Sequence, residues 1–396
     1  MTMKRRGATW AACALSLLTP LSAHALDEAI GRALFRRAWV PAPSSTQAND
    51  GLGPLFNARS CTACHGNLDR MPVQTGDGNA VTDEHLVLRF SDSAGRPDPT
   101  YGRQMQTSAV AGVAPEGRVV LSEHGYRAAG LAYGETGLGI RTGALLAPSL
   151  RGLGDLQTVP DEALAALAAD NAHRDDGVRG RVNWVVDRDG QRRAGRFGWK
   201  ASLPSLEAQV ESAFALDLGL STEGRPRPEG DCTSAQETCL AAPMGNRNAP
   251  FEIPPEIVSR ITAYLASVKA PALPESDRHG LAAFEHTGCA ACHRPSLPGS
   301  AGPVQAFTDL LLHDLGPDLD GGATEPGVAP TEWRTAPLRG LSRTLANEAG
   351  LMHDGRARTL EEAIALHGGE AAFSRTRFTS LPEVEKRRLL AFLNSL

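Results

Sequence analysis

The chain has 396 residues, of which 41% are hydrophobic and 21% are charged, and its formal net charge is −5. This composition is typical of a globular protein and excludes collagen, a disordered chain and a polytopic membrane protein. A net acidic chain without a block of lysines or arginines is also a poor candidate for binding nucleic acid. The length predicts two or three domains.

The first 25 residues have the features of an export signal. Basic residues at 4–6 precede an apolar stretch at 8–18, and Ala23-His24-Ala25 has the small residues of a cleavage site. The apolar stretch is shorter than a membrane span, which takes about 20 residues. Lipid attachment at Cys13 is a weaker alternative, because the residues before it form a poor lead-in. We therefore expect residues 1–25 to be removed and the mature chain to be periplasmic, with no transmembrane anchor.

The most informative feature is the motif Cys-x-x-Cys-His, which occurs at 61–65 and again at 289–293. It is the attachment pattern of c-type haem: two thiols bind one porphyrin, and the histidine that follows reaches the iron. A zinc site would need a second ligand pair nearby, and a redox dithiol would not repeat with a histidine after it. We predict two covalently attached c-type haems, with His65 and His293 as iron ligands. The attaching cysteines are Cys61, Cys64, Cys289 and Cys292.

Two further cysteines, Cys232 and Cys239, close a short loop in a stretch rich in glycine, proline and serine. An exported chain reaches an oxidising compartment, where such a pair favours a disulfide. We expect a structural disulfide here rather than a reactive pair.

The surroundings of the two motifs are similar to each other. Gly53-Pro54-Leu55-Phe56 precedes the first motif, and Gly280-Leu281-Ala282-Ala283-Phe284 precedes the second. The helical apolar spacing of 255–265 is repeated at 382–393. In a cytochrome c domain one helix leads into the haem site and a last helix packs across it, and that pattern occurs here twice.

A second similarity links 147–153 with 336–341. Ser205 and Thr359, which each follow one of these stretches, both have the features of a helix N-cap. The whole haem-binding unit is therefore predicted to be duplicated.

A short proline-containing linker at 270–274 separates the two copies. We predict an N-terminal cytochrome c-like haem domain with insertions at 26–270 and a C-terminal cytochrome c domain at 271–396.

Some of the inserted residues of the N-terminal domain have strand character. Residues 84–91 and 118–123 are strand-like, and 181–197 has two β-rich runs around Asp189-Gly190, which is a hairpin signal. The predicted fold is mainly α, with two cytochrome c-like haem domains and a small β insertion in the first.

The second ligand of the C-terminal iron has several candidates: His313, His353 and His367, with Met352 as a competitor. A helix that starts near Thr359 would place His367 on the inward, apolar face, which favours His367. The alternative is a histidine hydrogen-bonded in the core.

The second ligand of the N-terminal iron is left open. His85, His124, Met71 and Met105 all lie in segments without clear periodicity. A vacant position is the other possibility, and it is the one that peroxide or oxygen would need.

Five stretches resemble a known family: GLGPLFNARSCTACH (51–65), GRFGWKA (195–201), DLLLHDLGPDLD (309–320), WRTAPLRGL (333–341) and HDGRARTLEEAIALHGGEA (353–371). They resemble the di-haem oxidoreductase family, described as peroxidases and formerly as thiol oxidoreductases. That family is part of the superfamily of bacterial di-haem cytochrome c peroxidases and MauG. The resemblance covers nearly all of the mature chain.

The resemblance implies roles for several residues. His367 stands where the relatives have the distal ligand of the C-terminal haem, which implies a bis-His haem of lower potential than a His/Met haem. Trp199 stands where the relatives have a tryptophan between the haems, which implies an electron bridge; core packing is the alternative. Arg334 and Arg339 are candidates for pairing with haem propionates.

The resemblance also implies a peroxide pocket. Gln209 matches the glutamine of that pocket, but the carboxylate that moves a proton between the two peroxide oxygens has no clean match. Asp217 and Glu211 are the nearest candidates, and Glu116 is a more distant one. The alternative for each is an ordinary solvated or capping carboxylate.

We therefore predict an exported, peroxidase-like di-haem oxidoreductase, with electrons passing from the C-terminal haem through Trp199 to a reactive N-terminal haem. The alternative is a di-haem electron-transfer cytochrome without a reaction of its own. The expected partner is a redox protein, such as a small cytochrome, or a small-molecule oxidant. Calcium between the domains, as in the peroxidases, is a further candidate cofactor.

Overall fold

The computed structural model describes residues 23–245, 249–273 and 277–396. The predicted export signal lies almost entirely outside these described residues. Among the helices within them, none combines the length and the apolar character that crossing a membrane takes.

The helices are mostly short, and the bounds of each are as follows: α1 (Ala23–Arg36), α2 (Cys61–Cys64), α3 (Leu153–Gln157), α4 (Asp161–Asn171), α5 (Leu206–Asp217), α6 (Glu237–Leu240), α7 (Pro255–Ser267), α8 (Arg278–Thr287), α9 (Leu341–Ala346), α10 (Leu360–Ala365), α11 (Ala372–Ser380) and α12 (Glu383–Ser395).

The strands form small antiparallel sheets of two strands each. The pairs are β1 (Leu55–Phe56) with β3 (Ser108–Ala109), β2 (Leu86–Ser91) with β6 (Arg141–Leu146), β4 (Arg118–Ser122) with β5 (Gly125–Ala129), β7 (Trp184–Val186) with β8 (Arg192–Ala194), and β9 (Leu312–Asp314) with β10 (Glu332–Arg334). The predicted strands at 84–91 and 118–123 and the hairpin around Asp189-Gly190 are confirmed by β2, β4 and the β7–β8 pair.

The prediction of a mainly α fold, with β structure only as a small insertion in the first domain, is wrong. Helix accounts for 33% of the residues and strand for 15%, and β9 and β10 lie after the second motif. One physical reason is that 41 glycines and 27 prolines break the chain into short elements joined by loops. The strands β3, β9 and β10 span only two or three residues, which is too short for a periodic pattern to show.

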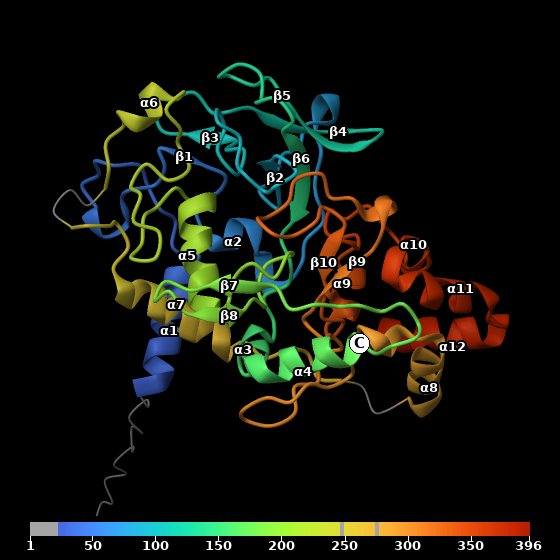
Figure 1. The fold of residues 1–396 in the computed structure, drawn as a ribbon. Helices are drawn as coiled ribbons and strands as arrows, with labels where there is room; N and C mark the ends of the chain where they lie inside the picture. Colours follow the sequence, from blue (N-terminus) through green and yellow to red (C-terminus); the bar gives the residue numbers. More distant parts are fainter. Residues whose placement is uncertain (1–22, 246–248, 274–276) are drawn as a thin grey trace, which may run out of the picture.

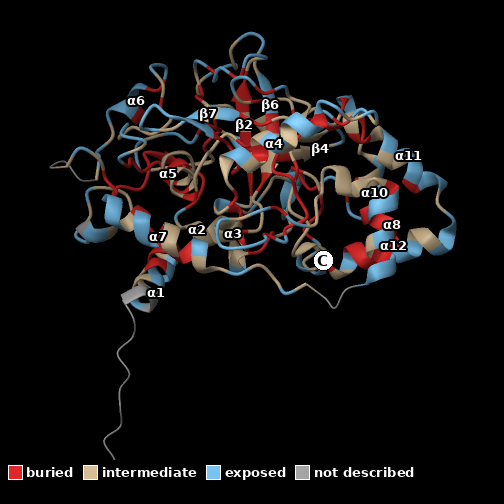
Figure 2. Ribbon diagram, turned by 60° about the horizontal axis from the view of Figure 1, so that its bottom comes forward, coloured by how far each residue is buried: buried red, intermediate tan, exposed pale blue. Residues whose placement is uncertain are grey.

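The hydrophobic residues form two main clusters. The larger is built on α1, α5 and α7, where the ring centroids of Phe35 and Tyr264 lie 5.6 Å apart. The smaller is built on α8 and α12, where Phe284 and Phe392 lie 5.7 Å apart. The two helical groups lie at opposite sides of the molecule, with β2–β6 and β9–β10 between them (Figure 1). Buried residues gather in the centre, whereas α4 and α11 carry exposed ones (Figure 2).

The larger cluster crosses the predicted boundary between the two domains. Leu297, Val304 and Leu311 follow the second motif, yet they pack in the cluster built on α1, α5 and α7. The boundary at 270/271 therefore stays a prediction, and the two halves share part of one core.

The repeated stretches at 147–153 and 336–341 adopt the same local structure. Gly152 and Gly340 have φ values of 76° and 92°, and each stands immediately before a short helix, α3 or α9. A positive φ is a conformation that glycine adopts without strain. The repeat is therefore a turn into a helix, which requires glycine at this position in both copies.

The predicted disulfide between Cys232 and Cys239 is present. Both residues are buried and pack against Leu55 of β1. The disulfide therefore holds the loop around α6 against the β1–β3 pair.

Asp69 joins the two halves of the chain shortly after the first motif. Its carboxylate accepts hydrogen bonds from Arg151 Nε at 2.7 Å and from Arg343 Nε and Nη2 at 2.9 and 2.6 Å. The Asp69 side chain is 5% exposed, whereas that of Arg343 is 48% exposed. One carboxylate thus links the turn before α3 to α9.

Replacing Asp69 by asparagine is expected to lower the free energy of unfolding by about 1–3 kcal/mol, between the values for exposed and buried ion pairs. Burial opposes ionisation, but the two arginines hold the pKa of Asp69 below its ordinary value. Its contribution is therefore present above about pH 4 and is lost as the pH falls further. Urea unfolding of the haem-loaded protein at pH 7 and pH 3 measures both effects. The exposed pair Glu385–Arg388 gives the control: Glu385→Gln should cost much less than Asp69→Asn, because an exposed ion pair contributes little. Equal losses in the two variants would contradict the assignment.

Candidate functional site

A single cavity of about 870 Å³ lies between the two helical groups and receives side chains from both Cys-x-x-Cys-His motifs. Its size is within the range of cofactor and ligand sites, roughly 300–1,000 Å³. The predicted site residues that line it are Cys61, Cys64, His65, Trp199, Gln209, Asp217, Cys289, Cys292, His293, Arg334, Arg339 and His367. The two predicted haem sites therefore open into one space.

The first motif forms the four-residue helix α2, and His65 follows it directly. His65 Nδ1 lies 3.1 Å from the carbonyl oxygen of Pro148, in the repeated stretch before α3. Because a carbonyl can only accept, Nδ1 carries the proton and Nε2 is left with a free lone pair. Burial lowers the pKa of His65 to about 4. The ring is therefore neutral at physiological pH, which is the form that binds a metal.

The second motif begins after α8, where Gly288 ends the helix with φ of 92°. His293 repeats the arrangement of His65: its Nδ1 lies 3.2 Å from the Phe307 carbonyl oxygen, and burial lowers its pKa to about 4. Burial also raises the pKa of the thiols of Cys61 and Cys289 to about 12. Before haem is attached, these thiols are therefore protonated, unlike the exposed thiolates of a reactive dithiol.

His367 lies opposite His293, with 6.4 Å between the ring centroids. Two imidazole–metal bonds of about 2.0–2.1 Å and two ring radii add to about 6 Å, so one metal ion fits between the rings. His367 Nδ1 lies 2.7 Å from the Ala363 carbonyl oxygen, which again leaves Nε2 free. The helix α10 begins at the predicted place, with a capping box between Thr359 and Glu362. It ends at Ala365, so His367 lies just beyond the helix rather than in its second turn.

The competing ligands of the C-terminal site have other contacts. His313 is held by Asp309 at 2.8 Å and Glu370 at 2.7 Å. His353 stacks on Trp333, with 3.9 Å between the ring centroids. Met352 lines the cavity and packs against the smaller hydrophobic cluster. The geometry therefore favours His367.

Buried arginines supply a test of whether a haem fits. Arg334 donates only to the backbone carbonyls of Gly198 and Thr335, and Arg89 Nε is buried with no partner among the described residues. Asp309 attracts Arg334, and Asp217 and Asp231 attract Arg89, but neither guanidinium forms an ion pair with them within the described residues, so each can still take up an anion. Both side chains line the cavity, and haem carries two propionates, so the residues fit the cofactor.

Arg339 also lines the cavity, but its guanidinium already donates hydrogen bonds to the carbonyls of Pro271 and Gln305. Arg89 was not predicted from the sequence, because a single arginine in a strand carries no local signal.

Among the three candidate carboxylates, only Asp217 lines the cavity. It accepts a hydrogen bond from Gln104 Nε2 at 2.9 Å, and burial raises its pKa. Glu211 accepts from the backbone N–H of Gly224 instead. Glu116 is buried against Gln106 and Gln236, and burial raises its pKa to about 8.

Gln209 and Asp217 both belong to α5, which starts at the predicted Ser205 cap. They are eight positions apart, so they are separated by about 12 Å along the helix. A peroxide molecule is too small to contact both at once. The structure thus brings both predicted residues to the cavity but does not form one glutamine–carboxylate pair.

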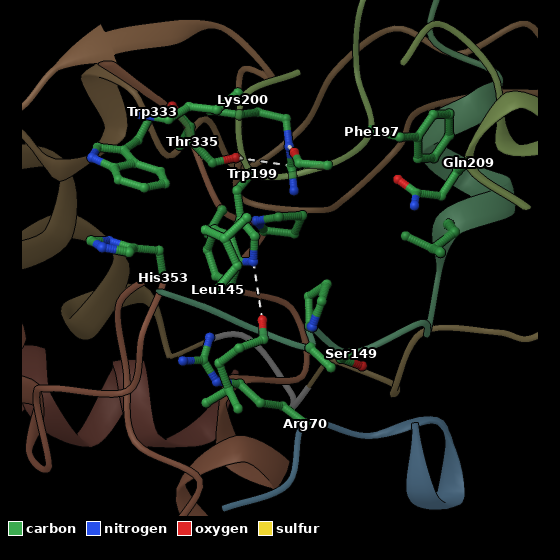
Figure 3. A pocket seen from close by; sticks show the side chains of 18 of the residues that line it. Arg70, Leu145, Ser149, Phe197, Trp199, Lys200, Gln209, Trp333, Thr335 and His353 are labelled. Carbon is green, nitrogen blue, oxygen red and sulfur yellow. Dashed lines mark hydrogen bonds between the residues drawn. The ribbon is translucent and has the colours of Figure 1, made fainter. Parts of the chain in front are cut away.

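Trp199 lies in the middle of the cavity, between Gln209 on one side and the Trp333–His353 pair on the other (Figure 3). Gly198, with φ of 76°, forms the turn that leads into it. Trp199 Nε1 donates to the Leu146 carbonyl at 3.0 Å, and the Trp199 carbonyl accepts from the Arg334 N–H at 3.0 Å. The indole is therefore fixed to Leu146, and the Trp199 backbone is fixed to Arg334 in the second half of the chain.

Of the four candidates for the second ligand of the N-terminal site, His85 alone lines the cavity. Its Nδ1 lies 3.0 Å from the Pro72 carbonyl oxygen. His65, His293 and His367 likewise have Nδ1 beside a backbone carbonyl and Nε2 free. The cavity lining does not include His124, Met71 or Met105.

Calcium stays a prediction. Within the described residues, the one compact group of three possible metal-binding side chains is Cys292, Asp309 and His313. It contains a predicted haem cysteine and a histidine held by carboxylates, and is not the all-oxygen set that calcium prefers.

Comparison with known proteins gives one family. The model described as "Di-haem oxidoreductase, putative peroxidase" matches residues 134–396, which include the second motif but not the first. No curated protein matches the chain. A solved structure titled "Kuenenia stuttgartiensis Hydrazine Synthase Pressurized with 20 bar Xenon" aligns with 100% of this chain and 98% of its own, at 14% identity and a TM-score of 0.35, which does not establish a shared fold. The family match spans more than half of the residues, and the chain therefore belongs to the di-haem oxidoreductase family.

Proposed function

We propose that the chain is an exported, periplasmic c-type di-haem oxidoreductase that reduces a peroxide. When bound to the two motifs, the haems would supply redox chemistry: electrons would enter at the C-terminal site and would reduce the peroxide at the N-terminal site. The observation that carries the proposal is that both motifs, the His293–His367 pair and Trp199 line one cavity.

The two ends of the cavity differ in a way that fits a division of roles. At the C-terminal end, two neutral imidazoles face each other. This fits a centre that transfers electrons and whose iron has no position left for a substrate. At the N-terminal end, Asp217 acts electrostatically on Cys61 and Cys64, which places a carboxylate beside the first motif. A carboxylate there is what proton movement during cleavage of a peroxide requires.

Asp217 is proposed to accept a proton from one peroxide oxygen and to return it to the other, which leaves as water. Its hydrogen bond from Gln104 orients the carboxylate, with one oxygen left for the peroxide. Gln209, about two turns away, is proposed to donate its amide N–H at the cavity wall near Trp199. Trp199 separates the two ends and is proposed to carry electrons between them. The electron donor is proposed to be a small redox protein, such as a cytochrome.

One observation favours the alternative of an electron-transfer cytochrome. His85 lines the cavity with Nδ1 occupied and Nε2 free, so it has the form of a second iron ligand. A six-coordinate N-terminal centre would leave no position for peroxide.

Rapid mixing with hydrogen peroxide distinguishes these functions. We expect the haem absorption spectrum of the half-reduced protein to change on mixing, at a rate that rises linearly with peroxide concentration. An unchanged spectrum in both the oxidised and the half-reduced protein would contradict the peroxidase proposal. The His85→Ala variant is the control, because a reaction that appears only in this variant would identify His85 as a blocking ligand.

A further inference from the structure

Trp199 has a buried positive charge against its ring. The Cζ atom of Arg70 lies 5.5 Å from the indole centroid, within the range of a cation–π contact. Arg70 is only 7% exposed. It donates from Nη2 to the Met352 carbonyl at 2.5 Å, while its Nε has no partner among the described residues. Asp354 attracts it but does not form an ion pair with it. In Figure 3, Arg70 lies beside Trp199 in the same pocket.

Trp333, the second tryptophan of the cavity, has the same kind of neighbour. The Lys200 ammonium lies 3.4 Å from its ring centroid, and Lys200 is 5% exposed. Three backbone carbonyls accept from this ammonium, at Ala329, Pro330 and Glu332. Trp333 lies between Lys200 and the stacked ring of His353 (Figure 3).

A positive charge against an indole opposes the removal of an electron from that ring. Removal would create a second positive charge a few ångströms away, in surroundings of low dielectric constant where the repulsion is only weakly screened. Both side chains donate to neutral carbonyls and form no ion pair within the described residues. Carboxylates attract them without pairing with them: Asp354 attracts Arg70, and Glu332, Asp320, Glu325 and Asp314 attract Lys200.

We propose that Arg70 and Lys200 protect the two cavity tryptophans from oxidation, so that Trp199 conducts electrons without being consumed. This rests on the proposed function, which brings peroxide into the same cavity. The reaction that they suppress is hydroxylation of the indole. In it, the O–O bond of hydrogen peroxide breaks, a hydroxyl group replaces a ring hydrogen, the ring is oxidised by two electrons, and the second hydroxyl leaves as water with the displaced hydrogen. Arg70 and Lys200 are thus tuning residues that act through the rings they contact.

Peptide mass spectrometry of the haem-loaded protein after treatment with hydrogen peroxide tests the proposal. Burial lowers the pKa of Lys200 to about 7 and that of Arg70 to about 10, so pH 6 keeps both side chains charged. In Arg70→Gln, the hydroxylated fraction of Trp199 is expected to rise at least threefold, with Trp333 unchanged. In Lys200→Met, the reverse selectivity is expected.

The charge-conserving variants Arg70→Lys and Lys200→Arg separate charge from packing, because they should keep wild-type levels of oxidation. Equal oxidation of each tryptophan in all variants, or a rise in the charge-conserving variants as large as in the neutral ones, would overturn the proposal.

A second arm uses azide radicals generated by pulse radiolysis, which oxidise indole rings without peroxide, followed by the same peptide analysis. If the wild-type haem spectrum does not respond to peroxide, the proposed function fails. The azide arm then still shows whether Arg70 and Lys200 protect the two rings, with the same expected selectivity.

Discussion

Replacing Asp217 by asparagine is expected to slow peroxide reduction by about 10²–10⁴-fold, the usual contribution of a positioned acid or base. Asparagine has nearly the same shape and can keep a hydrogen bond to Gln104, but it cannot accept and return a proton. Both haems should remain attached, because Asp217 is not part of either motif. Steady-state turnover with a reduced cytochrome, combined with the haem content by mass spectrometry, measures the two quantities separately.

Glu211→Gln is the matched control for Asp217→Asn. Glu211 belongs to the same helix, but its side chain accepts from Gly224 N–H and does not line the cavity. Its replacement should change turnover by less than about threefold, as expected for a side chain remote from the reaction. A large loss in Glu211→Gln, with Asp217→Asn unaffected, would move the acid–base role to Glu211.

The pH dependence follows from the direction of the Asp217 pKa. Burial raises it above the ordinary value for aspartate, so the reactive carboxylate is present at high pH and is lost as the pH falls through the raised pKa. Wild-type turnover should therefore decline as the pH falls through this raised pKa. Because Asp217→Asn has no such group, its remaining activity should lack this decline. A pH–rate profile of both proteins checks the difference.

Features with a local physical signal could be predicted from the sequence. The spacing of each Cys-x-x-Cys-His motif places two thiols and one imidazole together on a single turn, and the Ser205 and Thr359 caps mark the helix starts that the structure contains. The helical repeat also distinguishes two candidate carboxylates: at about 100° per residue, Asp217 stands about 80° around the helix from Gln209, whereas Glu211 stands about 160° away, almost opposite.

Features that depend on contacts between distant parts of the chain could not be predicted. Arg70 and Met352 are 282 positions apart, and Lys200 reaches the carbonyl of Glu332 across 132 positions. No motif surrounds Arg70, Arg89 or Lys200, because what distinguishes them is their place on the cavity wall without an ion pair among the described residues. The same limit applies to the fold class, since the β9–β10 pair consists of two short strands that become a sheet only when the tertiary structure brings them together.

Replacing His367 by alanine is expected to convert the C-terminal haem from low-spin to high-spin, because one of the two facing imidazoles is removed. The change should be complete in the absorption and electron paramagnetic resonance spectra of the oxidised protein. The haem itself should remain attached, since Cys289, Cys292 and His293 are intact. His367→Met should restore a low-spin spectrum with a higher reduction potential, because a thioether raises the potential of a His-ligated haem.

Met352→Leu is the matched control for His367→Ala, since Met352 lines the same cavity and competes for the same position. It should leave the low-spin spectrum unchanged. If Met352→Leu gave the high-spin form and His367→Ala did not, methionine would be the ligand. In that case the C-terminal centre would have the higher potential of a His/Met haem, and donor proteins of higher potential could also reduce it. The spin state of these two variants therefore determines which class of donor protein can supply electrons to the cavity.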